Sequence, residues 1–274
     1  MMDPTLKEVV DDLACVAAKV DARLLLVGAY ARDLCLGTQE EARKTSDVDF
    51  AMQLESWAKV DAFFAESADT FRDPNRAELL LYHRATGTKV DVVPCGRIES
   101  PPGTLALRDS TRRLNTAGLA ECFELGRPLE PSGRILLPPP AGFIVLKLLA
   151  FTDRREHRDL RDVGHVLHRF PFDADEIWGD TAVMSAFEDG TLTHDDVRFW
   201  RAGCEIARCF TQQTIAQVVQ ALDKLRNETA ALRVLVLDGS IERIDSSARL
   251  AKADRVLHVL RRAVTESVAA ETDG

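Results

Sequence analysis

The stretch Thr45-Ser-Asp-Val-Asp-Phe-Ala51 decides the fold of this chain, because its polar and apolar residues alternate. Alternate side chains of a β-strand lie on the same face of the sheet. Asp47 and Asp49 therefore share one face, while Val48 and Phe50 point into the protein. Two neighbouring carboxylates repel each other unless a cation lies between them. The pattern indicates either a divalent-cation site or an edge strand whose charges face solvent.

A short apolar segment and a helix surround a turn of small residues before the two aspartates. Arg23-Leu-Leu-Leu-Val27 predicts a buried strand, Gly28-Ala29 predicts a turn, and residues 30–36 predict a helix that begins directly after it. This order of elements exposes backbone N–H groups and the positive end of the helix dipole, which attract anions. Gly28 and Ala29 are therefore candidate phosphate-binding residues, and a purely structural turn is the alternative.

A third acid lies on a later segment with the same alternation. Lys89-Val-Asp-Val-Val93 places Lys89, Asp91 and Val93 on one face of a strand. We expect this strand to pair in antiparallel fashion with the aspartate strand, so that Asp91 supplies a third ligand to the same site. Mg²⁺ prefers such hard oxygen ligands and takes others from the phosphates of a nucleotide. The alternative for Asp91 is a charge at a strand end in water.

The composition of the chain limits its class. Its 274 residues predict one large domain or two modest ones, and the 46% of apolar residues suffice for a core. Six cysteines without a CxxC pair indicate free thiols in a reducing cytoplasm. The polar first residues predict no signal peptide, and no apolar run approaches the roughly 18 residues of a membrane span. The net charge of −9 argues against a general nucleic-acid coat.

The triple proline in Leu137-Pro-Pro-Pro-Ala141 is the expected domain boundary. Before it we expect the sheet to be completed by edge strands at 121–125 and 133–137. After it, amphipathic segments such as 214–226 and 251–264 predict a mostly helical region. Lys147 interrupts the apolar helix expected at 141–151, and a buried lysine requires an anionic partner. A bound triphosphate, a nearby aspartate or an extension of the side chain to the surface would each satisfy it.

Together these motifs resemble the DNA polymerase β-type nucleotidyltransferase superfamily, whose pattern is h-G-[GS], a spacer, D-h-[DE]-h and a later strand acid. The matching residues are Gly28-Ala29, Asp47-Val-Asp49 and Asp91. The segment Leu26-Val-Gly-Ala-Tyr-Ala-Arg-Asp33 is also similar to the V-G-G-x-x-R-D opening of tRNA CCA-adding enzymes. Alanine at the second position of h-G-[GS] keeps the backbone N–H but lacks the hydroxyl of serine.

The overall sequence is most similar to stand-alone bacterial nucleotidyltransferases of the abortive-infection AbiEii type. In these proteins an L-K-L-x-A-x-x-D-R element and a K/R-D-x-x-D element follow the core. The matching segments are Leu146-Lys-Leu-Leu-Ala-Phe-Thr-Asp-Arg154 and Arg158-Asp-Leu-Arg-Asp162. The resemblance runs from about residue 22 to residue 170, which is over half of the chain.

The resemblance implies an α+β fold: a polymerase β-like nucleotidyltransferase core with a mixed sheet at 1–138, then a mostly helical domain at 139–274. It implies an enzyme that transfers an NMP from an NTP, such as ATP, to an acceptor hydroxyl and releases pyrophosphate. Asp47, Asp49 and Asp91 would bind Mg²⁺ or Mn²⁺ and form the catalytic set. The residues that would bind the nucleotide are Gly28, Ala29, Arg32, Lys44, Lys147 and Asp162.

The AbiEii resemblance further implies a toxin-like enzyme that modifies tRNA or another RNA and has a cognate antitoxin as its partner. A small molecule or a protein stays open as the acceptor. The acidic net charge weighs against RNA unless the basic stretch from Arg154 to Arg169 provides the contact. Two other classes also stay open: a non-catalytic nucleotide-binding regulator and a helical interaction module of a two-component system.

Overall fold

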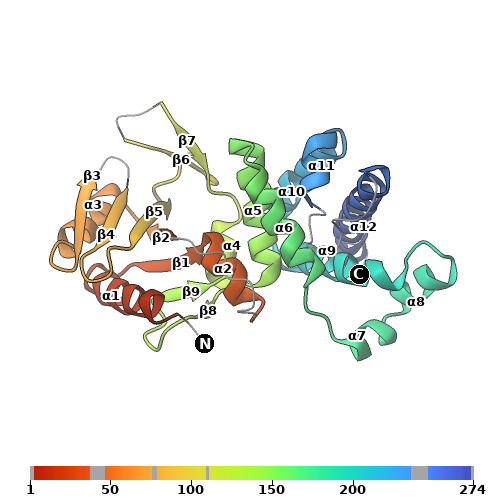
Figure 1. The fold of residues 1–274 in the computed structure, drawn as a ribbon, viewed down its shortest axis with the longest axis horizontal. Helices are drawn as coiled ribbons and strands as arrows, with labels where there is room; N and C mark the ends of the chain where they lie inside the picture. The colour runs from red at the N-terminus through yellow and green to blue at the C-terminus, as the bar shows by residue number, and fades with distance from the viewer. Residues whose placement is uncertain (1–2, 38–46, 76–78, 109–110, 236–245, 273–274) are drawn as a thin grey trace. The chain divides into compact units, whose positions relative to one another are not determined.

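The strands that carry the apolar segment and the aspartates lie next to each other in a mixed sheet (Figure 1). The computed structural model describes residues 3–37, 47–75, 79–108, 111–235 and 246–272. The chain divides into two compact units, Met1–Phe143 and Ile144–Gly274. The domain limits expected from the sequence, 1–138 and 139–274, stay a prediction, because compactness alone does not show which part folds independently.

Within the described residues of the first unit, a seven-stranded sheet has the order β3-β4-β5-β2-β1-β9-β8. Its strands are β1 (Arg23–Val27), β2 (Asp47–Leu54), β3 (Phe71–Asn75), β4 (Leu80–His83), β5 (Lys89–Gly96), β8 (Arg127–Pro128) and β9 (Ile135–Leu137). Strands β6 (Thr104–Ala106) and β7 (Arg113–Asn115) form a separate hairpin. The apolar run of β1 is buried because a central strand has protein on both of its faces.

Strand β5 pairs with β2 in parallel, so the expected antiparallel pairing is wrong. Between the two strands the chain passes through helix α3 (Trp57–Glu66) and the antiparallel strands β3 and β4. Such a long crossover is what allows the chain to return in the same direction. Strand β1 is antiparallel to β2, with Val27 opposite Asp49. The order of the strands nevertheless makes β5 the neighbour of β2, as a shared site requires.

Four helices lie entirely within the described part of the first unit. These helices are α1 (Pro4–Val20), α2 (Gly28–Cys35), α3 and α4 (Leu119–Leu125). The side chain of Asp3 caps α1 by accepting hydrogen bonds from the backbone N–H groups of Thr5 and Leu6. The expected edge strand at 121–125 is wrong, because this segment lies in α4. The buried residues Leu119, Cys122 and Phe123 have helical spacing, which outweighs the short alternation in the sequence.

The second unit is helical in its described part, as the sequence predicts. Its helices are α5 (Pro140–Arg154), which contains the division between the units, α6 (His157–His168), α7 (Ala174–Gly179), α8 (Thr181–Glu188), α9 (Val197–Cys209), α10 (Gln212–Arg226), α11 (Thr229–Leu235) and α12 (Ser246–Thr272). Helix α9 packs along α12, and α6 packs against α11. The predicted α+β class, a mixed sheet with helices followed by a mostly helical part, is confirmed.

Two further expectations concern the whole chain. All six cysteines carry free thiols, as predicted. In the described part of the chain, every helix is too short or too polar to span a membrane.

Candidate functional site

The three acids singled out in the sequence lie on one face of two adjacent strands. The register sets Asp49 of β2 beside Asp91 of β5, and Asp47 beside Lys89. On both strands the alternate residues, such as Phe50 and Val92, are buried beneath the sheet. The apolar half of each pattern therefore fixes the orientation of the charged half. Asp91 faces the same side as the aspartate pair, as the sequence requires for a shared site.

A lysine lies among these acids. The Nζ atom of Lys89 is 2.7 Å from Oδ2 of Asp91 and 3.6 Å from Oδ2 of Asp47. The hydrogen bond to Asp91 raises the pKa of Lys89 above its usual value, and the negative charges of Asp91, Asp47 and Asp49 add to this effect. The contacts of one ammonium with Asp91 and Asp47, together with the register that sets Asp49 beside Asp91, place the three carboxylates near one another on this face.

The turn at Gly28 lies directly against the second aspartate. Gly28 has a φ of +74°, and a β carbon built on it would lie 2.0 Å from Oδ2 of Asp49. Glycine is required here because of both the backbone conformation and the approach of the carboxylate. Helix α2 begins at this turn after Val27, whose apolar side chain cannot accept a hydrogen bond from the first N–H groups. An anion-attracting helix end and the acids therefore lie side by side.

The residue types on this face suit a hard divalent cation, which takes carboxylate oxygens as ligands. Within the described ranges, however, no group of three His, Cys, Asp or Glu side chains is already arranged to hold a metal ion. Asp47 and Asp91 both face the ammonium of Lys89, so their side chains have to turn from it to share a cation. The carboxylate oxygens are of the kind that a hard divalent cation binds, and the ligand role of the three acids stays a prediction.

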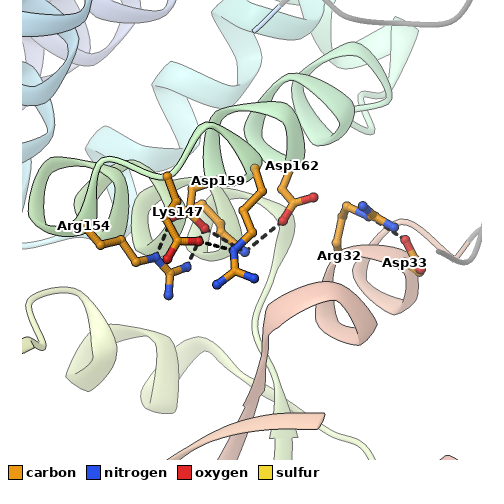
Figure 2. Close-up of polar contacts among 8 residues, drawn as sticks. Arg32, Asp33, Lys147, Arg154, Asp159 and Asp162 are labelled. Carbon is orange, nitrogen blue, oxygen red and sulfur yellow. Dashed lines mark hydrogen bonds and ion pairs between the residues drawn. The ribbon is translucent and has the colours of Figure 1, made fainter. Parts of the chain in front are cut away.

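Lys147 and Asp162 belong to a buried cluster of charges in the second unit (Figure 2). The Nζ atom of Lys147 on α5 is 3.1 Å from Oδ1 of Asp159 and 2.8 Å from Oδ2 of Asp162, both on α6. Arg154 donates from Nε and Nη2 to the two oxygens of Asp159, at 2.7 and 2.6 Å. Of the possibilities that the sequence left open for Lys147, a nearby aspartate is therefore present.

Asp159 is the centre of this cluster and was not singled out in the sequence. Its side chain is completely buried, and burial alone would raise its pKa. The hydrogen bond from Arg154 and the charge of Lys147 outweigh burial and hold the pKa of Asp159 below its ordinary value. Asp159 and Asp162 are three residues apart and share a helix face, which is the signal that could have identified Asp159. The nucleotide-binding role of Lys147 and Asp162 stays a prediction.

The remaining residues expected to bind a nucleotide have different environments. Arg32 on α2 is buried, and its Nε is 2.6 Å from Oδ1 of Asp33 (Figure 2). Its guanidinium group is thus partly neutralised by its neighbour in the chain. Ala29 lies half-buried in the first turn of the same helix. Lys44 lies outside the described residues.

Comparisons with known proteins find only distant similarity. No family model matches the chain, and no curated protein matches it. Among solved structures, the antibiotic-resistance factor ANT(2'')-Ia is similar with a TM-score of 0.38 and 15% identity, over 69% of this chain and 95% of that chain. A CCA-adding enzyme in complex with CTP is similar with a TM-score of 0.33 and 14% identity, over 100% of this chain and 70% of that chain. At these values the chemistry has to be argued from the residues of this chain.

Proposed function

We propose that this protein is a metal-dependent nucleotidyltransferase, which transfers an NMP from an NTP to an acceptor hydroxyl and releases pyrophosphate. The observation that carries the proposal is the register that sets Asp49 beside Asp91, on the face of Asp47, with the Gly28 turn against Asp49. This register places carboxylates that suit a divalent cation next to a helix N-terminus that suits phosphate. Nucleotidyl transfer requires both.

The residues of this chain have separate tasks in the proposed reaction. Asp47, Asp49 and Asp91 would hold Mg²⁺ or Mn²⁺, which would stabilise the charge on the entering and leaving oxygens. The backbone N–H groups of Gly28 and Ala29 bind phosphate oxygens at the start of α2. The acceptor oxygen forms a bond to the α-phosphorus, the bond from that phosphorus to the bridging oxygen breaks, and pyrophosphate leaves. The acceptor proton passes to a base or to solvent.

The proposal also assigns Arg32, Lys44, Lys147 and Asp162 to nucleotide binding. Arg32 supports it because this cation lies on the helix that begins at the phosphate-binding turn. The short distance from Lys147 to Asp162 supports an orienting role for the acid. For the acceptor, the AbiEii-type motifs extend the proposal to tRNA or another RNA, with a cognate antitoxin as the partner of a toxin-like enzyme. This extension rests on the sequence motifs alone.

A transfer assay tests the proposed function. The full chain is incubated with each of the four α-labelled NTPs in turn, Mg²⁺ or Mn²⁺, and total RNA, and an Asp49→Asn variant serves as the matched control. We expect label on the RNA with the wild-type chain and none with the variant. Binding of the NTP without transfer to RNA, protein or small molecules would support the regulator instead. If neither binding nor transfer occurs, the interaction module is the better description.

A further inference from the structure

Among the residues that the structure describes, Lys89 is a cation that lies with the three acids on the charged face of β2 and β5. Lys89 and Asp91 are two residues apart on β5, so their side chains share a face. The register places Lys89 directly opposite Asp47 on the neighbouring strand. Its ammonium bridges the two strands, because it contacts one acid on each of them: Asp91 of β5 at 2.7 Å and Asp47 of β2 at 3.6 Å.

We propose that Lys89 is a built-in counter-ion of Asp47 and Asp91 and that its ammonium leaves them when a divalent cation binds. This inference rests on the proposed function, since it concerns the same three acids. Lys89 is then a positioning residue. It holds the acids of two strands together in the metal-free protein, and it lowers the affinity of the site for metal.

The reason is competition for the same oxygen atoms. Oδ2 of Asp91 and Oδ2 of Asp47 face the ammonium, so a metal ion that binds these oxygens has to replace it. The two cations also repel each other at such short range. The side chain of Lys89 is 31% exposed, and it is long and flexible enough to turn into solvent. Removal of the ammonium takes one positive charge away from carboxylates that repel one another, and a metal ion relieves this repulsion.

The affinity for Mn²⁺ tests the inference without any need for catalysis. Isothermal titration calorimetry measures the affinity of the full chain for Mn²⁺ alone, at one fixed pH near neutrality. The proteins compared are the wild type, Lys89→Met, Lys89→Arg and Asp49→Asn. We expect Lys89→Met to bind Mn²⁺ about three- to tenfold more tightly than the wild type, the range for releasing two partly exposed ion pairs. Lys89→Arg keeps the competing charge and is expected to bind Mn²⁺ as the wild type does.

Thermal unfolding provides a second measurement. In EDTA, Lys89→Met is expected to have a lower Tm than the wild type, because Asp47 and Asp91 lose their ion pairs with Lys89. The rise in Tm upon addition of Mn²⁺ is expected to be larger for Lys89→Met than for the wild type. A role of Lys89 in packing alone would lower Tm without increasing this rise. If Lys89→Met does not fold, Lys89→Gln replaces it in both measurements.

The outcomes separate the inference from the proposed function. If the wild type binds Mn²⁺ in a way that Asp49→Asn abolishes, and Lys89→Met binds equally well or more weakly, the inference is overturned and the proposed function stands. If no Asp49-dependent binding of Mn²⁺ occurs in the wild type or in Lys89→Met, the metal-dependent function fails and the inference fails with it. Tighter binding by Lys89→Met, with Lys89→Arg unchanged, supports both.

Discussion

Gly28 and Asp49 approach each other so closely that a β carbon on the glycine would lie 2.0 Å from a carboxylate oxygen. The carboxylate is the end of a side chain and can move, so a β carbon at position 28 would displace it from the position that it has in the structure. The contact thus links the conformation of the turn to the position of an acid. It also explains why a residue with a β carbon does not fit at this point.

Gly28→Ala is expected to reduce activity much more than stability. The positive φ costs about 1–2 kcal/mol for any residue with a β carbon. The displaced carboxylate of Asp49 is expected to lower NMP transfer by about a hundredfold, because errors of about 1 Å have effects of this size. Initial rates of label transfer and urea unfolding of both proteins measure the two effects.

Gly87→Ala is the matched control for Gly28→Ala. Gly87 has a φ of +73°, almost the same as Gly28, but a β carbon there would meet nothing within 4 Å. This variant is expected to lose a similar amount of stability and to keep its transfer activity. Equal activity of the two variants would show that the contact between Gly28 and Asp49 has no part in the reaction.

Asp159→Asn is expected to destabilise the protein by about 3 kcal/mol, because it leaves Lys147 and Arg154 without the buried carboxylate that they share. Lys147 keeps Asp162, while Arg154 is 44% exposed and can reach water, so the loss lies near the lower end of the range for broken buried pairs. Urea unfolding followed by circular dichroism measures the change. Asp254→Asn removes a half-exposed pair with Arg226 and is expected to cost less than about 1 kcal/mol.

The stability contributed by Asp196 is expected to disappear in acid. Burial alone would raise the pKa of Asp196, but hydrogen bonds from Arg255 and Thr193 outweigh it and hold the pKa below its ordinary value. The folded state therefore binds fewer protons here than the unfolded state, whose aspartate pKa is about 3.9. The contribution is complete above that value and is lost as the pH falls through the folded-state pKa.

Asp196→Asn tests this dependence on pH. We expect the variant to lose about 2 kcal/mol of unfolding free energy at pH 7, the effect of hydrogen bonds to a charged group. The difference from the wild type should shrink as the pH is lowered below about 4. Guanidinium unfolding at several pH values measures it. A difference that stays constant down to about pH 2 would contradict the assignment.

Gly164→Ala is expected to destabilise the protein although alanine favours helices. A β carbon at Gly164 on α6 would lie 2.0 Å from the backbone oxygen of Leu235 on α11. The helices have to separate, which costs about 1–3 kcal/mol and exceeds the gain of up to about 1 kcal/mol in helix propensity. The Tm of the variant measures the net effect. Gly179→Ala, where a β carbon would meet nothing within 4 Å, is expected to leave Tm unchanged or higher.

The sequence predicts the acid-bearing strands well because their apolar residues specify one face. Val48 and Phe50 have to be buried, and this requirement alone orients Asp47 and Asp49. The direction of β5 could not be predicted, since alternation is the same in parallel and antiparallel strands. The contacts of Lys89 with Asp47 and Asp91 could not be predicted either. They depend on the register between two strands that are separated in the chain, and the alternation of residues does not specify this register. The sequence does not single out Asp159, because a charged segment at the start of a helix is usually exposed to solvent. Its burial becomes apparent only when the elements that pack against it are known.

The crossover between β2 and β5 determines the order in which the site can arise. The turn at Gly28 and the first two acids lie on strands that follow each other in the chain and pair directly. The third acid follows only after α3, β3 and β4 along the chain, and the longer loop makes its pairing with β2 slower to form. During synthesis, a nascent chain that ends before Lys89 therefore has two carboxylates and the turn but no complete set. The set of three acids is complete only when β5 has paired with β2.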